Sequence, residues 1–213
     1  MPLNREALRL YLITDPRLCA QLGVVETVGR AVAGGVSMVQ LRDKLASTQE
    51  RVALARALKL ALKGTGVPLI INDDLEAALL SDADGVHIGQ SDGSPLETRA
   101  RLGPDRILGL SCETRQLVMA ANGTPVDYLG LGPVFATGTK ADHERPIGIT
   151  GLTQLVAQTD LPTVAIGGLN AGHVNEVLAT GADGLSVVST ICGQEDPQRA
   201  AKGFFPSKTE VQQ

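Results

Sequence analysis

The chain has 213 residues, of which 43% are hydrophobic, 20% charged and only 2% aromatic, and its formal net charge is −4. This composition is typical of a globular protein with enough residues for one full core. It argues against nucleic-acid binding, which needs a basic face or stacking rings, and no apolar run approaches the roughly 18–20 residues that span a bilayer.

The amino-terminal stretch "MPLNREALRLYLITD" lacks a basic region followed by a long apolar segment. We therefore expect no secretory signal, no membrane partner and a cytoplasmic location. The three cysteines, Cys19, Cys112 and Cys192, are far apart and form no CxxC pair. This spacing predicts small buried thiols in a reducing compartment, and it argues against a disulfide framework or a cysteine-built zinc site.

Eight short apolar runs recur along the chain, at residues 10–15, 37–42, 68–73, 85–90, 106–111, 127–133, 162–168 and 184–189. Helical periodicity lies between them. In residues 48–64, Val52, Ala55, Leu58 and Leu62 fall on one face, with Thr48 as the expected N-cap and Gly64 just past the end.

Strand and helix alternating eight times predict an α/β fold, a single (β/α)8 TIM barrel. We expect one domain over residues 1–213, with the barrel at about 10–203 and a tail, 204–213, whose polar end frays. A doubly wound open sheet also accommodates eight strands, but no G-x-G-x-x-G follows the first one. The segments "SDADGVHIGQ" and "ATGADGLSVVS" echo each other, each as a helix end, a tight turn and a buried strand.

Active sites of such barrels lie at the carboxyl ends of the strands. The second strand ends in "QLRDK", where Gln40 and Arg42 share a face because side chains alternate along a strand. Arg42 and Lys44 predict a clamp for a phosphate or diphosphate. The alternative is a salt-bridge layer inside the barrel, in which Arg42 pairs with an aspartate.

The third strand ends in "INDD" and the fourth runs into "VHIGQSD". Asp73 and Asp92 would then lie on adjacent loops beside Asn72, as oxygen ligands of the kind that Mg²⁺ prefers. The alternative for Asp73 or Asp74 is capping of the next helix. His87, alone in an apolar strand, is expected to be a hydrogen-bonded structural residue.

Hydroxyls, an ammonium and glycines follow the later strands. Ser111 ends the fifth strand with no His or Asp beside it in sequence, which argues against an activated nucleophile. Thr137, Thr139 and Lys140 predict a phosphate cradle. "IGG" at Gly167 and Gly168 and "VVS" at Val188 and Ser189 follow strands seven and eight, where many barrels hold a phosphate. Two anion sites indicate two phosphorylated small-molecule substrates, one a metal-bound diphosphate.

Seven motifs in this order resemble the thiamine-phosphate synthase family: "YLITD", "QLRDK", "IIND", "GVHIGQSD", "GLGPVFATGTK", "AIGGLN" and "GLSVVS". The resemblance covers about residues 10 to 203. It implies a transferase that joins a hydroxymethylpyrimidine diphosphate to a thiazole phosphate and releases pyrophosphate. The implied mechanism is dissociative: the diphosphate leaves first, and the thiazole nitrogen captures the resulting cation.

The resemblance also implies residue roles. Mg²⁺, one per subunit, would bind Asp73 and Asp92. Arg42, Lys44, Ser111 and Lys140 would act in catalysis. The pyrimidine diphosphate would contact Gln40, Leu41, Arg42, Asp43, Lys44, Asn72, Ser111 and Lys140, and the thiazole phosphate would contact Thr137, Gly138, Thr139, Gly168, Val188 and Ser189.

Two segments depart from the family pattern. "SCET" carries Glu113 where the family often has a histidine, and "ADHERPIG" replaces a Lys-Asp-rich loop. The segment 132–148 is the candidate lid. The sequence does not fix the number of subunits, and a homo-oligomer is compatible with it.

Three other functions fit a barrel of this kind. A thiazole tautomerase-like relative would bind the thiazole phosphate without coupling it, but it would be expected to lose part of the diphosphate and metal set. A phosphosugar epimerase or aldolase would need paired acid/base carboxylates or a Schiff-base lysine inside the barrel. A catalytically inactive phosphate-binding barrel would have no use for a complete pair of metal ligands.

Overall fold

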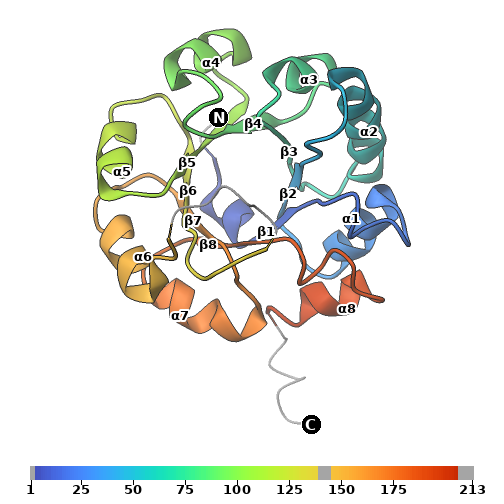
Figure 1. Ribbon diagram of the computed structural model, residues 1–213. Coiled ribbons are helices and arrows are strands. Elements are labelled where there is room, and N and C mark those ends of the chain that lie inside the picture. The colour runs from blue at the N-terminus through green and yellow to red at the C-terminus, as the bar shows by residue number, and fades with distance from the viewer. Residues whose placement is uncertain (1–2, 139–144, 206–213) are drawn as a thin grey trace.

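The computed structural model describes residues 3–138 and 145–205, and it forms a closed barrel of eight parallel strands (Figure 1). Each strand pairs with the next, and β8 pairs with β1. The strands are β1 (Leu10–Ile13), β2 (Met38–Leu41), β3 (Leu69–Asn72), β4 (Gly85–Ile88), β5 (Ile107–Cys112), β6 (Tyr128–Leu131), β7 (Thr163–Ile166) and β8 (Gly184–Val187). The predicted (β/α)8 barrel is confirmed, and the open sheet, which would leave two unpaired edges, is wrong.

Helices form an outer ring around the strands (Figure 1). They are α1 (Val24–Ala33), α2 (Thr48–Ala61), α3 (Leu75–Leu80), α4 (Pro95–Leu102), α5 (Arg115–Ala121), α6 (Gly148–Val156), α7 (Val174–Ala179) and α8 (Pro197–Lys202), with the 3-10 helices η1 (Arg5–Leu8) and η2 (Ala171–His173). Within the described ranges, no helix is long and apolar enough to cross a bilayer.

Helix α2 begins differently from the prediction. Ser47 is its N-cap: the Ser47 hydroxyl accepts a hydrogen bond from the Glu50 backbone, and the Glu50 carboxylate accepts one from the Ser47 N–H. The expected cap, Thr48, is the first helical residue, because the Ser47–Glu50 pair satisfies two backbone donors at once. The predicted apolar face of α2 is confirmed, since Val52, Ala55, Leu58 and Leu62 are all buried.

Alternation along the strands separates two cores. An outer core between strands and helices takes residues such as Leu10, Leu12, Val39 and Leu41. An inner core closes the barrel from within, and Leu8 of η1 extends it across the amino-terminal end. The inner core consists of Leu8, Tyr11, Met38, Ile70, Tyr128 and Val164. Above it, toward the carboxyl ends, inward positions such as Gln40, Asn72, Ser111 and Gly130 are polar or glycine and line a hollow.

One polar side chain stands immediately before each even-numbered strand. Each accepts a hydrogen bond from a backbone N–H at the start of the preceding strand. We call these four residues the lower rim: Ser37 (from Leu10, 2.9 Å), Asp84 (from Leu69, 2.8 Å), Asp127 (from Leu108, 2.7 Å) and Asp183 (from Thr163, 2.8 Å). The three aspartates also pair with Lys59, Arg99 and Arg5. The echoed Ala-Asp-Gly turns therefore contain two members of one recurring device that fixes strand to strand.

The remaining sequence expectations concern the cysteines and the carboxyl end. All three cysteines are buried and free, as predicted. Phe204 is buried, and the Arg9 guanidinium lies 4.2 Å from the centre of the Phe205 ring. The rest of the tail lies outside the described residues.

Candidate active site

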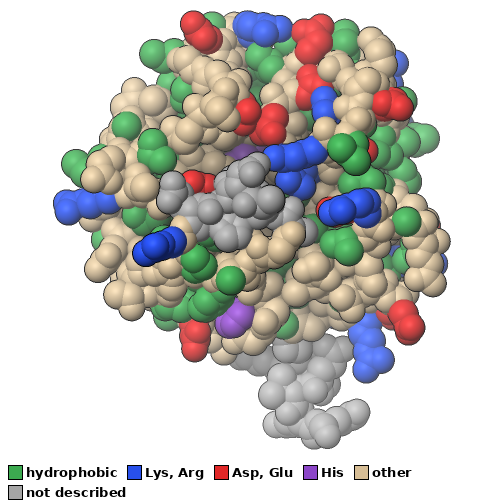
Figure 2. Space-filling model, in the orientation of Figure 1, with side chains coloured by type: hydrophobic (Ala, Val, Ile, Leu, Met, Phe, Trp, Pro, Cys, Tyr) green, Lys and Arg blue, Asp and Glu red, His purple; other side chains and the backbone are tan. Residues whose placement is uncertain are grey.

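A cavity of about 800 Å³ opens at the carboxyl ends of the strands. It gathers most of the predicted site residues: Gln40, Arg42, Lys44, Asn72, Asp73, Asp92, Ser111, Thr137, Gly138, Gly168, Val188 and Ser189. Basic and acidic side chains lie next to one another at this mouth, over the ends of β2 to β4 (Figure 2). The two anion regions expected from the sequence are therefore parts of one hollow.

Two of the described predicted residues, Leu41 and Asp43, do not line this cavity. Leu41 is fully buried in the outer core, so its side chain cannot reach a ligand there. Asp43 faces an adjoining hollow of about 1010 Å³, which also borders Lys44, Asn72, Asp73 and Asp92. Thr139 and Lys140 lie outside the described residues, as does part of the candidate lid.

The end of β2 carries the cationic group. Gln40 and Arg42 both line the cavity, as the alternation predicted, while Leu41 between them points outward. Within the described ranges, neither Arg42 nor Lys44 forms an ion pair with a carboxylate. The alternative of a salt-bridge layer around Arg42 therefore finds no support, and both cations face the hollow with their charge available.

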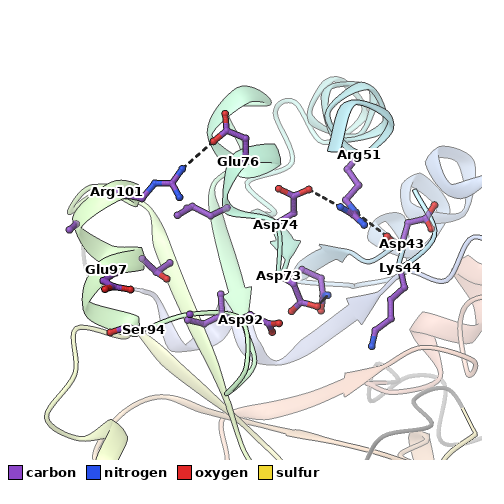
Figure 3. Close-up of a pocket in the computed structure, with 16 residues that line it drawn as sticks. Asp43, Lys44, Arg51, Asp73, Asp74, Glu76, Asp92, Ser94, Glu97 and Arg101 are labelled. Atoms are coloured by element: carbon purple, nitrogen blue, oxygen red, sulfur yellow. Dashed lines mark hydrogen bonds and ion pairs between the residues drawn. The ribbon is translucent and has the colours of Figure 1, made fainter. Parts of the chain in front are cut away.

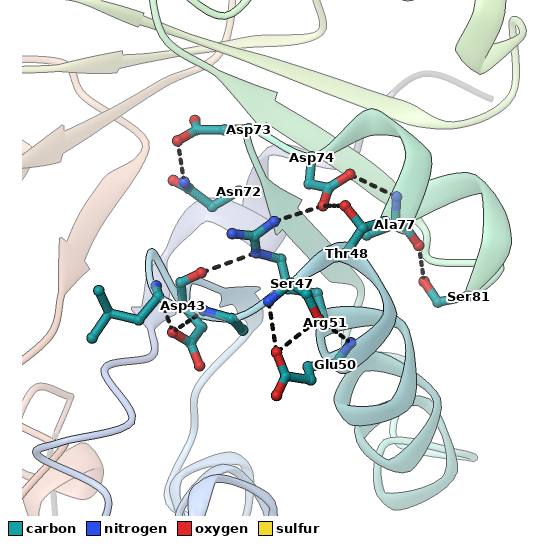
Figure 4. Close-up of polar contacts among 12 residues, drawn as sticks. Asp43, Ser47, Thr48, Glu50, Arg51, Asn72, Asp73, Asp74, Ala77 and Ser81 are labelled. Carbon is teal, nitrogen blue, oxygen red and sulfur yellow. Dashed lines mark hydrogen bonds and ion pairs between the residues drawn. The ribbon is translucent and has the colours of Figure 1, made fainter.

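The loop after β2 is held by its own polar contacts. One Asp43 oxygen accepts hydrogen bonds from the backbones of Leu45 and Ala46 (3.0 and 3.1 Å). Arg51 of α2 donates to the Asp43 carbonyl (2.9 Å) and to the Asp74 carboxylate (2.7 Å), as Figure 4 shows. Arg51 thus ties the loops after β2 and β3 together and fixes the position of Lys44 relative to the aspartates.

The two aspartates after β3 have different tasks. Asp74 is the N-cap of α3, accepting from the Ala77 backbone (2.8 Å), and its other oxygen binds Arg51 and the Thr48 hydroxyl (Figure 4). The sequence left open which aspartate caps the helix. Because Asp74 caps it, Asp73 is available to the mouth, and its φ of 61° is a conformation that aspartate tolerates better than most residues.

Asp73 and Asp92 approach each other across the mouth (Figure 3). Burial and the neighbouring Asp92 carboxylate raise the pKa of Asp73 to about 6, although a hydrogen bond from Asn72 (2.5 Å) and the charge of Lys44 act in the opposite direction. Asp92 is oriented by the Gly89 backbone N–H, 2.7 Å from its carboxylate. Two crowded carboxylates of like charge are the arrangement that a divalent cation relieves.

The oxygen atoms of these side chains suit a hard cation that also binds water and substrate oxygens. No group of three metal-ligating side chains occurs among residues 3–138 and 145–205. Two aspartates with an adjacent amide suit Mg²⁺, which usually binds one or two carboxylates and completes its shell with water and phosphate oxygens. The residues present therefore fit Mg²⁺ bound jointly by protein and substrate.

Ser111 at the end of β5 meets a partner that the sequence did not indicate. Its hydroxyl lies 2.9 Å from His87 Nε2, and His87 Nδ1 lies 2.9 Å from the Tyr128 hydroxyl. His87 is hydrogen-bonded, as expected. Its proximity to Ser111 was missed because the two residues are 24 positions apart and meet only when β4 and β5 pair.

Glycines shape the opposite side of the cavity. Gly167 and Gly168 have φ values of 100° and 64°. A Cβ on Gly168 would lie 2.6 Å from the Ala136 carbonyl oxygen, so only glycine allows the turn after β7 to pack against the segment after β6. Val188 and Ser189 begin a turn after β8, in which the Val188 carbonyl accepts from Ile191 and Cys192. The first amides of such a turn have no acceptor within it.

Comparison with known proteins identifies the family. The sequence profile described as "Thiamine monophosphate synthase" matches residues 10–191. A thiamine-phosphate synthase of Xanthobacter autotrophicus is 52% identical over 92% of this chain and 93% of its own, and one of a Psychrobacter species is 48% identical over 93% and 94%. A solved thiamine phosphate pyrophosphorylase from Pyrococcus furiosus superposes with a TM-score of 0.86 at 35% identity, covering 98% of this chain and 99% of that one.

The chain belongs to the thiamine monophosphate synthase family. The expected resemblance is thereby confirmed. The departure at Glu113 from the usual thiamine monophosphate synthase pattern concerns the site directly, because Glu113 lines the cavity beside Ser111. A carboxylate there adds negative charge to the cavity.

The sequence also missed several cavity residues of this thiamine monophosphate synthase fold. Tyr11 and Ser186 line the cavity from the strands, and Asp15 lines it just after β1. In the sequence alone, each of these residues resembles an ordinary core or turn residue. The available signal was the pair of inward glycines, Gly109 and Gly130, whose strands leave room for large polar side chains nearby.

Proposed function

We propose that the protein condenses 4-amino-2-methyl-5-(diphosphooxymethyl)pyrimidine with 4-methyl-5-(2-phosphooxyethyl)thiazole, giving thiamine phosphate and pyrophosphate. The observation that carries this proposal is the single cavity in which converging carboxylates, available cations and a cup of glycines and hydroxyls meet. Family membership supplies the substrates, and the cavity supplies groups for a diphosphate and for a second phosphate.

The pyrimidine diphosphate would bind toward β2 to β5. Arg42 and Lys44 would hold its phosphates, since their charge is not consumed by ion pairs with described carboxylates. Gln40 and Asn72 would contact the same substrate, and Ser111 would donate its hydroxyl. The Lys140 ammonium, outside the described residues, is assigned here by the family pattern alone.

Asp73 and Asp92 would hold one Mg²⁺ per subunit. When bound, this ion supplies positive charge that neutralises the diphosphate and makes it a better leaving group. The crowding that raises the pKa of Asp73 supports a cation at this position, because the cation relieves the repulsion between the two carboxylates.

The reaction breaks the bond between the pyrimidine methylene carbon and the diphosphate oxygen, and the electron pair leaves with pyrophosphate. The cation that forms is stabilised by the ring amino group. The thiazole nitrogen then donates its lone pair to the methylene carbon. Arg42 and Lys44 stabilise the departing charge by position alone, so no nucleophilic side chain is required. The barrel walls hold the acceptor nitrogen near the cation and limit water.

The thiazole phosphate would bind toward β6 to β8. Thr137 and Gly138, with Thr139 beyond the described residues, would contact it from one side. Gly168, Val188 and Ser189 would contribute backbone N–H groups from the other side, as expected of the loops after the last two strands of a barrel.

A coupling assay tests the proposal. The purified protein is mixed with both substrates and Mg²⁺, and thiamine phosphate and pyrophosphate are followed with an EDTA control. We expect both products in equal amounts and their loss with EDTA. Binding of the thiazole phosphate without any product would contradict the proposal and favour the tautomerase-like function.

A further inference from the structure

A chain of hydrogen bonds crosses the interior of the barrel at the floor of the cavity. Gln40 Nε2 lies 2.8 Å from the Tyr11 hydroxyl, which lies 2.8 Å from the Tyr128 hydroxyl. The Tyr128 hydroxyl lies 2.9 Å from His87 Nδ1, and His87 Nε2 lies 2.9 Å from Ser111 Oγ. All members of this chain except Tyr128 line the cavity.

Four of the five members of the chain are shielded from water, and Ser111 at its end is half-buried. Tyr11 and Tyr128 are 1% and 0% exposed, Gln40 is 2% exposed and His87 is 8% exposed. Burial raises the pKa of both tyrosines above the usual range, so their hydroxyls keep their protons. Each buried hydroxyl must then place one proton on an acceptor, because an unsatisfied buried donor is costly.

This requirement gives the chain a direction. The Gln40 amide nitrogen can only donate, so the Tyr11 oxygen accepts from it. The Tyr11 proton then goes to Tyr128, and the Tyr128 proton goes to His87 Nδ1. An Nδ1 that accepts leaves the ring proton on Nε2, which donates to Ser111.

We propose that His87 is a positioning residue that acts through Ser111. As the Nε2–H tautomer, it occupies a lone pair of the Ser111 oxygen and thereby directs the Ser111 O–H proton into the cavity. A donor directed this way suits an anionic substrate oxygen, whereas a hydroxyl that donates to His87 would present lone pairs to the anion. This inference rests on the proposed function, since it assigns Ser111 a donor's part toward the diphosphate substrate.

The strands next to His87 are built to admit this arrangement. His87 is paired in register with Gly109, and Gly109 with Tyr128. A Cβ on Gly109 would lie 2.4 Å from His87 Nδ1 and 2.3 Å from Tyr128 Cζ. A Cβ on Gly130, which is paired with Ser111, would lie 3.2 Å from His87 Cε1. The glycines therefore form a slot that fixes the ring between Tyr128 and Ser111.

The tautomer can be measured without any turnover. Nitrogen chemical shifts and one-bond couplings in ¹⁵N-histidine-labelled protein distinguish a protonated Nε2 from a protonated Nδ1. The chain has three histidines, so substituting His143 and His173 in turn identifies their signals, and the remaining signals belong to His87. We expect Nε2–H in the protein without substrates. An Nδ1–H ring would mean that the chain runs from Ser111 toward Gln40, and it would overturn the inference.

Two variants separate positioning from packing. In His87→Gln the amide nitrogen can take the place of Nε2 and still donate to Ser111. In His87→Asn the shorter amide can reach Tyr128 but not Ser111. We expect His87→Asn to lower kcat about ten- to a hundredfold and His87→Gln to retain most of it, on the scale of one hydrogen bond to a charged group. Equal losses that follow the fall in Tm would overturn the inference.

A double variant tests whether His87 acts through Ser111. Ser111→Ala should lower kcat by itself, and adding His87→Asn should lower it no further. Losses that multiply would contradict the inference. Absence of product with the wild-type protein would instead contradict the proposed function, and the nitrogen shifts would still decide the direction of the chain.

Discussion

The two ends of this barrel treat the same residue type in opposite ways. At the lower rim, each aspartate accepts from a strand N–H and pairs with a lysine or arginine, as Asp127 does with Leu108 and Arg99. At the mouth, Asp73 and Asp92 face each other, while Arg42 and Lys44 form no ion pair with a described carboxylate. Satisfied charge at the rim stabilises the fold. Charge left available at the mouth serves a ligand, at some cost to stability.

The largest effect should come from the mouth. Asp92→Asn keeps an oxygen for the Gly89 N–H but removes the negative charge that a metal ion needs. We expect activity at fixed Mg²⁺ to fall by a factor on the order of 100, with Tm unchanged or slightly raised because a like charge beside Asp73 is gone. Steady-state kinetics and thermal unfolding of the same preparation test this. Full activity, or a loss of activity that parallels a loss of Tm, would contradict a metal-binding role.

A substitution at the lower rim should lower stability and leave activity nearly unchanged. Asp127→Ala removes the acceptor for Leu108 and leaves the partly buried Arg99 with backbone carbonyls but no carboxylate, so the free energy of unfolding should fall by about 1–3 kcal/mol. Urea denaturation measures this change. At assay temperatures well below Tm, the kcat of this variant should stay within about twofold of the wild-type value. A control is Asp82→Asn, which keeps a residue that tolerates the φ of 55° at this position and removes only the exposed pair with Arg106, so the change should be less than about 0.5 kcal/mol.

A smaller effect is expected at the neutral member of the rim. The Ser37 hydroxyl accepts from Leu10 and donates to the Ala7 carbonyl (3.0 Å), tying β1 to β2 without an ion pair. Ser37→Ala should lower the free energy of unfolding by about 1 kcal/mol. Because no charge is removed, the loss should be the same at low and high salt. A salt-dependent loss, or no loss at all, would contradict this role of the Ser37 hydroxyl.

The smallest effect should come from Glu113. It lines the cavity where the family often has a histidine, so Glu113→Gln removes a negative charge near the diphosphate site. We expect KM for the pyrimidine diphosphate to fall about two- to fivefold at low salt and less at high salt, because partly solvated charges interact weakly and are screened. An unchanged KM at both salt concentrations would mean that Glu113 does not act on the substrate.

Much of this protein follows from local patterns in its sequence. Eight apolar runs separated by helical stretches predicted all eight strands, and alternation placed Gln40 and Arg42 on one face. These features depend on period and side-chain type, which neighbouring residues determine. Motif order predicted the family for the same reason, since each motif is a short contiguous stretch.

Only the tertiary structure decided which polar groups are satisfied. Asp74 instead of Asp73 caps α3, and Arg51 and Thr48 converge on Asp74 across two loops. The Ser47 cap of α2 was in contrast a local signal, because Ser47 and Glu50 form a capping box within four residues. The chain of hydrogen bonds from Gln40 to Ser111 is invisible in the sequence. Its members lie on five strands, and the closed barrel brings together side chains of strands that do not pair, such as Tyr11 of β1 and Tyr128 of β6. The protonation of these groups and the direction of their hydrogen bonds depend on distance and burial. Neither distance nor burial is a property of a local stretch of sequence.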